Sequence, residues 1–112
     1  MFSRGALLLV PFPFSDLSAA KRRPVLAVTR PDAYGDFIAL PVTSRPQATH
    51  GLPILAADLV AGKLPAPSWV RTDRIVTLNS GLVVKSVGRF AETFVAAAVE
   101  RFCACIGYPP NY

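Results

Sequence analysis

Residues 89–106 read RFAETFVAAAVERFCACI, in which apolar side chains return every three or four positions. This spacing predicts an amphipathic helix that lays its apolar stripe on a sheet. Gly107 is a natural end for such a helix, and Pro109 and Pro110 prevent its continuation. The expected stripe consists of Phe90, Phe94, Ala97, Ala98, Phe102 and Cys105.

Short apolar runs separated by proline and glycine fill the chain before this helix, which is typical of a small all-β unit. Residues 7–10 and 25–28 are apolar at every position, so we expect these strands to be buried on both faces, inside a barrel and beneath the helix. The segment 58–67 favours a helical turn closed by Gly62 and Pro65. Strands are expected at residues 6–12, 24–29, 36–43, 52–55, 68–78 and 82–86.

The length and apolar pattern predict one domain over residues 1–112, with a core of its own. No run approaches the roughly 18 consecutive apolar residues of a membrane span, so no membrane partner is expected. Pro11 and Pro13 interrupt the apolar start, which favours a first strand over a signal peptide. Cys103 and Cys105 lie two apart in the expected helix, where their side chains diverge, and free thiols fit a reducing, cytoplasmic setting.

Positive charge dominates the polar residues. Twelve Lys and Arg against seven Asp and Glu give a net charge of +5, which favours an anionic partner. Residues 21–24 read KRRP, and Pro24 holds the backbone of Arg23 extended. These three cations could form a phosphate-attracting entrance, although a solvated turn that protects a strand would have the same sequence.

A hydroxyl pair ends the third expected strand, where residues 41–44 read PVTS. Thr43 and Ser44 could hold a phosphate oxygen or orient a neighbouring arginine. Hydroxyl residues at strand ends are also common local turn formers, and the sequence leaves both interpretations open.

Residues 69–75, WVRTDRI, place an arginine and an aspartate two positions apart in a segment with strand character. Because strand side chains alternate faces, Arg71 and Asp73 should point the same way, together with Trp69. An acid beside a permanent cation is what a metal-free phosphodiester site needs, and a surface ion pair is the alternative. Trp69 could stack on a base or belong to the core. His50, the only histidine, lies in a polar loop and should be exposed.

Taken in order, these motifs resemble the MazF/PemK (Kid) toxin family, and the likeness covers most of the chain. The stretch FPFSD at residues 12–16 is similar to the PemK-like branch. The motifs that carry the likeness are Arg4-Gly5-x-x-x-Leu9-Val10, Lys21-Arg22-Arg23-Pro24-Val25-Leu26-Ala27-Val28, Pro41-Val42-Thr43-Ser44 and Ser68-Trp69-Val70-Arg71-Thr72-Asp73, followed by the helix.

This resemblance implies a compact SH3-like barrel of the MazF/PemK/CcdB type, mainly β with a C-terminal helix, that forms a homodimer. It implies a sequence-specific endoribonuclease, an mRNA interferase that cleaves single-stranded mRNA into 2′,3′-cyclic phosphate and 5′-hydroxyl ends. Such a protein is the growth-inhibiting toxin of a type II toxin–antitoxin pair, and its partners are the mRNA and a cognate antitoxin, with which it binds DNA.

The resemblance also assigns residues. Arg23 matches the family's arginine before proline, and Thr43 matches the threonine that ends the third strand. Both are active-site positions in relatives. Arg71 and Asp73 match the Arg-x-Asp pair that is assigned as acid and base in the PemK/Kid branch. The expected catalytic residues are Arg23, Thr43, Arg71 and Asp73, and the expected RNA-binding residues are Lys21, Arg22, Ser44 and Trp69. The family's longer first loop is replaced here by the shorter segment 15–22, in which Asp16 could substitute for the family's acidic residue.

Two rival functions stay open at this point. The same fold serves toxins that inhibit DNA gyrase by binding, and a catalytically silent relative could bind nucleic acid or antitoxin without cutting. Neither a metal nor an organic cofactor is expected, because no Cys, His, Asp and Glu cluster has metal-ligand spacing and no glycine-rich phosphate loop occurs.

Overall fold

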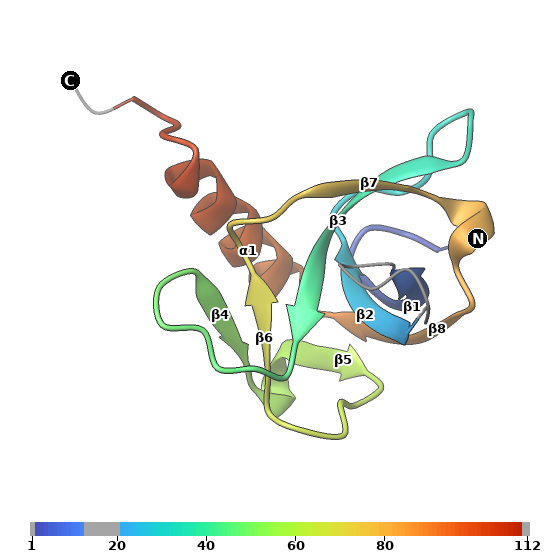
Figure 1. Ribbon diagram of the computed structural model, residues 1–112, viewed down its shortest axis with the longest axis horizontal. Helices are drawn as coiled ribbons and strands as arrows, with labels where there is room; N and C mark the ends of the chain where they lie inside the picture. The colour runs from blue at the N-terminus through green and yellow to red at the C-terminus, as the bar shows by residue number, and fades with distance from the viewer. Residues whose placement is uncertain (1, 13–20, 111–112) are drawn as a thin grey trace.

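The computed structural model describes residues 2–12 and 21–110. Within them the chain forms short strands and then one α-helix, as Figure 1 shows. The strands are β1 (Ala6–Phe12), β2 (Lys21–Ala27), β3 (Asp36–Thr43), β4 (Gly51–Ile54), β5 (Leu59–Ala61), β6 (Ser68–Arg71), β7 (Val76–Asn79) and β8 (Lys85–Phe90). Two 3-10 turns, η1 (Ala56–Asp58) and η2 (Ser80–Leu82), and the helix α1 (Glu92–Cys105) complete the described elements.

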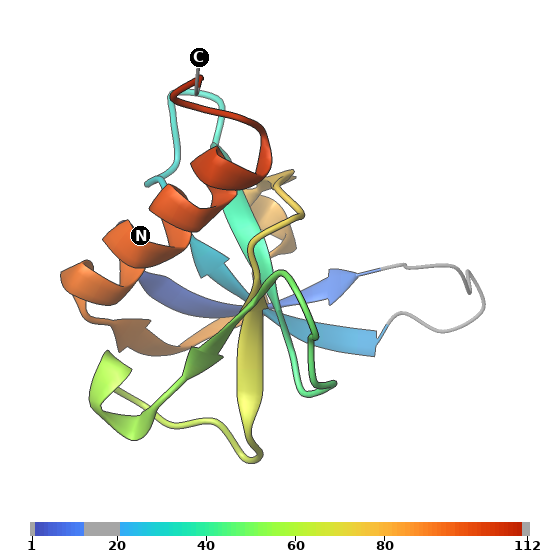
Figure 2. The same cartoon turned by 90° about the vertical axis from the view of Figure 1, so that its left-hand side faces the viewer.

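The strands form one curled antiparallel sheet in the order β4-β6-β3-β2-β1-β8-β5, and β7 pairs with β3 outside this path. Strand β3 divides its pairing along its length. Its first half pairs with β7, whereas its end pairs with β6, where Thr43 lies opposite Trp69. The sheet curls into a half-barrel with α1 packed against one side, which confirms the expected mainly β fold with a C-terminal helix (Figure 2).

Both faces of the central strands are buried, as the unbroken apolar runs predict. One face packs against α1 and contains Leu7, Leu26 and Leu40 together with Phe94 and Val95 of the helix. The other face, hereafter the face opposite α1, is lined by its own apolar cluster of Ala6, Leu8, Val10, Val25, Ala27, Phe37 and Ala39. Alternation along β1, β2 and β3 therefore sends successive side chains into two separate cores.

The helix is shorter than expected. Residues 89 and 90 belong to β8, and α1 begins at Glu92 after the cap residue Ala91. Phe90 nevertheless holds the helix to the sheet, because its ring stacks on Phe94 with ring centres 5.0 Å apart. The chain leaves the helix through Gly107, whose φ of 81° suits glycine, so the expected end is confirmed.

The expected stripe of α1 is only partly buried. Phe94 and Ala98 are buried, but so is Val95, which the stripe omitted, whereas Cys105 is exposed. The sheet covers only the first part of α1, and the rest of the helix extends past it in Figure 1. None of the helices in residues 2–12 and 21–110 is long and apolar enough to cross a membrane.

Several strand boundaries also differ from expectation. The expected strand 68–78 is broken by a turn into β6 and β7, and residues 59–61 of the segment 58–67 form strand β5 rather than a helical turn. The helical turn lies just before β5, at η1. Strand β5 pairs with β8, where Gly62 and Gly88 let the two backbones approach so closely that an added Cβ on Gly88 would lie 2.6 Å from the Ala61 oxygen. Smaller shifts place β2 at 21–27, β4 at 51–54 and β8 at 85–90.

Candidate nucleic-acid site

A bidentate ion pair between Arg71 and Asp73 forms the centre of the candidate site. The Nε of Arg71 donates to Oδ1 of Asp73 over 3.1 Å, and its Nη2 donates to Oδ2 over 2.7 Å. The two side chains are 26% and 24% exposed, so the pair is accessible from solvent and partly shielded from it. The contact does not arise from strand alternation, because β6 ends at Arg71 and Asp73 lies in the following turn. The prediction that strand alternation brings Arg71 and Asp73 together is therefore wrong, although their side chains do meet.

The pairing fixes the charge state of both partners. The hydrogen bond from Arg71 lowers the pKa of the Asp73 carboxyl, with smaller through-space contributions from Arg71 and His50. The same hydrogen bond raises the pKa of Arg71. The guanidinium therefore keeps its protons, and the carboxylate binds a proton less readily than an ordinary aspartate.

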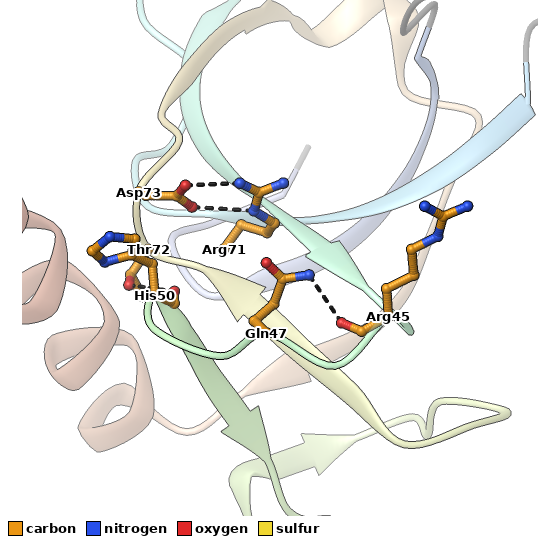
Figure 3. A network of polar contacts seen from close by, with 6 residues as sticks. All are labelled: Arg45, Gln47, His50, Arg71, Thr72 and Asp73. Atoms are coloured by element: carbon orange, nitrogen blue, oxygen red, sulfur yellow. Dashed lines mark hydrogen bonds and ion pairs between the residues drawn. The ribbon is translucent and has the colours of Figure 1, made fainter.

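Thr72, between the two charged residues, ties their turn to the preceding loop. The residue is 2% exposed, and its Oγ1 donates to the backbone oxygen of His50 over 2.7 Å. The backbone N–H of Thr72 donates to the same oxygen over 2.9 Å. Figure 3 shows Thr72 and His50 below the ion pair, with Gln47 and Arg45 earlier in the same loop. The loop after β3 is thus clamped to the turn that carries Asp73.

The hydroxyl pair lies at the end of β3, where Thr43 pairs with β6 and Ser44 follows the strand. Thr43 is half-buried and its Oγ1 accepts a hydrogen bond from the backbone N–H of Arg45 over 3.1 Å, as a local turn former does. Ser44 is exposed. Trp69, opposite Thr43, is half-buried and belongs to neither apolar cluster, so its ring is only partly covered.

The basic cluster lies on β2, where this strand pairs only with β1. Arg23 is opposite Val10 and Arg22 is opposite Pro11, and both arginines are exposed. The pairing of β2 with β3 stops at Val25, so residues 21–24 continue with β1 as a two-stranded ribbon, visible in Figure 2. Lys21 pairs with Phe12 in this ribbon. Asp16 and most of the shortened loop lie outside the described residues.

Strand register places the candidate residues on one side of the sheet. Arg23 is two positions before Val25, Val25 lies opposite Pro41, and Thr43 is two positions after Pro41. Residues two apart, and residues directly opposite in a pair, share a face. Trp69 and Arg71 extend the same row on β6. The face so defined, opposite α1, carries Arg23, Thr43, Trp69 and Arg71.

His50 is exposed, as expected for a polar loop. With Thr49 and Thr72 it forms one wall of a hollow of about 280 Å³, and the other wall is the end of α1. The helix contributes Arg101, Ala104 and Cys105 to this wall. The sequence suggested no role for Thr72, since its partner lies 22 positions away in the chain and only the fold brings the two together. Among the described residues, no group of three or more His, Cys, Asp and Glu side chains could hold a metal ion.

Comparisons with known proteins agree with this architecture. A family model described as PemK-like, MazF-like toxin of type II toxin–antitoxin system matches residues 3–106. No curated protein matches the chain. Among solved structures, the toxin MazF-mt6 of Mycobacterium tuberculosis superimposes with a TM-score of 0.69 at 21% identity, over 90% of this chain and 95% of that one.

Two further solved structures are complexes of two proteins. A MazE–MazF complex from Deinococcus radiodurans matches with a TM-score of 0.72 at 21% identity, over 94% of this chain and 95% of that one. An endoribonuclease in complex with its cognate antitoxin, from a mycobacterial species, matches with a TM-score of 0.68 at 19% identity, over 99% of this chain and 100% of that one. At these identities the likeness is one of fold.

Proposed function

Because the chain belongs to the PemK-like, MazF-like toxin family of type II toxin–antitoxin systems, we propose that it is a sequence-specific, metal-independent endoribonuclease that cleaves single-stranded mRNA. The observation that carries the proposal is the bidentate Arg71–Asp73 pair, which lies beside the sheet face that also carries Arg23 and Thr43. A surface ion pair alone would not need two further polar groups in register with it.

RNA supplies its own nucleophile, the 2′-hydroxyl, so the protein must accept a proton and stabilise charge on phosphorus. We assign Asp73 as the proton acceptor, Arg71 and Arg23 as donors to the phosphorane oxygens, and Thr43 as a hydrogen-bonding support. Attack by the 2′-oxygen breaks the bond to the 5′-oxygen and leaves a 2′,3′-cyclic phosphate and a 5′-hydroxyl.

The acid role that the resemblance attaches to the arginine is replaced here by an electrostatic one. A guanidinium loses its proton only above about pH 12, and the bond to Asp73 raises the pKa of Arg71 further. Arg71 therefore acts as a fixed positive charge with directed N–H groups. Nε and one N–H of Nη2 donate to Asp73, so the N–H groups on the other edge of the guanidinium are the ones that donate to a phosphate.

RNA reaches this site across a basic and partly aromatic surface. We assign Lys21, Arg22, Ser44 and Trp69 as RNA-binding residues, because cations such as the exposed Arg22 attract the phosphates and a half-covered indole can stack on an unpaired base. Single-stranded RNA is the favoured substrate, since in-line attack requires a backbone rotation that a regular duplex resists.

The biological setting follows from the family. Two of the superimposed toxins are held in complexes with their antitoxins, and we propose that this chain is likewise neutralised by a cognate antitoxin with an acidic disordered tail. We further propose that the toxin is a cytoplasmic homodimer that binds DNA together with the antitoxin.

The test is to incubate the purified protein with mixed-sequence single-stranded RNA in EDTA and to map the product ends. Discrete cuts with cyclic phosphate ends are expected, and annealing a complementary strand should protect them. Arg71→Ala and Arg23→Ala should each slow cleavage about 100- to 1,000-fold, the usual effect of removing one stabilising donor. Arg30→Ala, which removes an exposed arginine in the turn after β2, should cleave at the parental rate.

The rival functions give different results in the same assay. RNA retention without cutting would indicate a silent binding module, and inhibition of DNA supercoiling without RNA cleavage would indicate a gyrase inhibitor. Full activity of either arginine variant would refute the residue assignment.

A further inference from the structure

Gln47 is half-buried in the loop after β3, whose neighbouring residues are exposed. Residues 44–46 and 48–50 face solvent, whereas the side chain of Gln47 turns in toward β4 and β6. Its Nε2 donates to the backbone oxygen of Arg45 over 3.0 Å, so the amide is also held by its own loop (Figure 3). The side chain is therefore kept in one place at the edge of the candidate site.

Gly51 makes room for this side chain beside Trp69. Gly51 lies directly opposite Arg71 in the pairing of β4 with β6, so a side chain there would project from the same face as Arg71. A Cβ added to Gly51 would overlap Cβ of Gln47 and lie 3.2 Å from Cδ1 of Trp69. The stem of the glutamine and the edge of the indole thus meet over this glycine, on the face that carries Arg71.

The amide of Gln47 has hydrogen-bonding capacity to offer a ligand. The bond to Arg45 uses one N–H of Nε2, and the amide has a second N–H and the lone pairs of Oε1. Because the backbone oxygen of Arg45 can only accept, the amide nitrogen must face it, and this fixes where the second donor and the acceptor lie. The edge of a base presents donors and acceptors in an order that differs from base to base. A fixed amide therefore pairs fully with only some of these orders.

We propose that Trp69 and Gln47 form a subsite for one RNA base, in which the base stacks on the indole and the glutamine amide reads its edge. The inference rests on the proposed function and adds the residue that decides one position of the recognised sequence. Trp69 is two positions before Arg71 on β6 and opposite Thr43 of β3, so the base belongs to a nucleotide close to the cut. Single-stranded RNA suits this subsite, since its bases can splay out, stack on aromatic rings and pair along their edges.

The test is single-turnover cleavage of an oligoribonucleotide pool randomised around the cut, with the products sequenced. Gln47→Met keeps the length of the side chain and its packing over Gly51 but removes the amide. One bidentate base contact discriminates by about 5- to 150-fold, so the unaltered protein should show a preference of that size at one position near the cut, and Gln47→Met should lose it there. Preferences at the other positions should remain. Thr49→Ala, which changes an exposed residue of the same loop, should keep every preference.

A substrate without the base separates reading from a structural role. In an oligonucleotide with an abasic nucleotide at that position there is no edge to read, so the unaltered protein and Gln47→Met should cleave at the same rate. If Gln47→Met instead slows all sequences equally, the abasic one included, the glutamine only holds the loop, and the inference is overturned while the nuclease proposal stands. Unaltered preferences in Gln47→Met would overturn it as well. Failure of the unaltered protein to cut any sequence would overturn the proposed function and the inference together.

Discussion

Thr72→Val tests whether the clamp between the loop and the ion-pair turn holds the site in place. Valine keeps the shape of threonine and removes only the hydroxyl, whose bond to the His50 oxygen measures 2.7 Å. That oxygen keeps the N–H bond at 2.9 Å, so no buried acceptor is left without a donor. We therefore expect a loss of about 1 kcal/mol in the free energy of unfolding, the typical net value of one hydrogen bond. In a chain of this length the midpoint of thermal unfolding should fall by about 4 °C.

The effect on cleavage should be larger than the effect on stability. With one of the two hydrogen bonds to the His50 oxygen gone, the turn that carries Asp73 can move relative to the loop after β3, and a misplacement of about 1 Å can cost about 100-fold in rate. We expect single-turnover cleavage by Thr72→Val to slow about 10- to 100-fold. Urea unfolding followed by the fluorescence of the single tryptophan, Trp69, measures the stability of the same sample.

Thr72→Ser is the matched control. Serine keeps the hydroxyl but loses a buried methyl group, which also costs about 1 kcal/mol. The two variants should therefore be about equally destabilised, while only Thr72→Val loses activity. If the two variants cleave RNA equally well, the hydroxyl does not position the site and the reasoning fails.

Other predictions concern stability and binding. The hydrogen bond from Arg71 lowers the pKa of Asp73 from its usual 3.8. The pair therefore stabilises the fold above that pH, and this contribution is lost as pH falls through the lowered pKa. In Arg71→Gln the free energy of unfolding, measured by urea titration at acid pH, should depend less on pH. Gly107→Ala should cost roughly 1 kcal/mol in the free energy of unfolding, and Gly62→Ala well over that. Both glycines have positive φ, but only at Gly62 would the added Cβ overlap the β8 backbone. Equal urea midpoints for the two variants would contradict this. Trp69→Ala should weaken binding of single-stranded RNA by about 1 to 3 kcal/mol in filter-binding assays if its ring stacks on a base, and unchanged affinity would assign the ring to packing alone.

The local pattern of the chain was sufficient for much of the architecture. Strands β1 and β3 occupy the expected residues 6–12 and 36–43. The end of α1 was also predictable, because Gly107 readily adopts the positive φ found there. Burial of the 7–10 and 25–28 runs on both faces also followed from composition, because only a strand between two cores can be apolar at every position.

Pairing between distant segments decided the rest. Nothing near residues 59–61 in the chain marks them as a strand, because they become one only by pairing with β8 across the close approach of Gly62 and Gly88. The turn that breaks 68–78 into two strands likewise exists because β3 divides its pairing between β6 and β7.

The candidate site shows the same division. The sequence determined which charged residues are present and that Arg71 and Asp73 are near neighbours in the chain, so that some contact between them was accessible to local reasoning. Only the tertiary structure joined Thr72 to His50, 22 positions away, and set Arg23, Thr43 and Trp69 on one face. The physical reason is that hydrogen-bond register and buried contacts between separate strands depend on how the sheet curls, which no local pattern of side chains specifies.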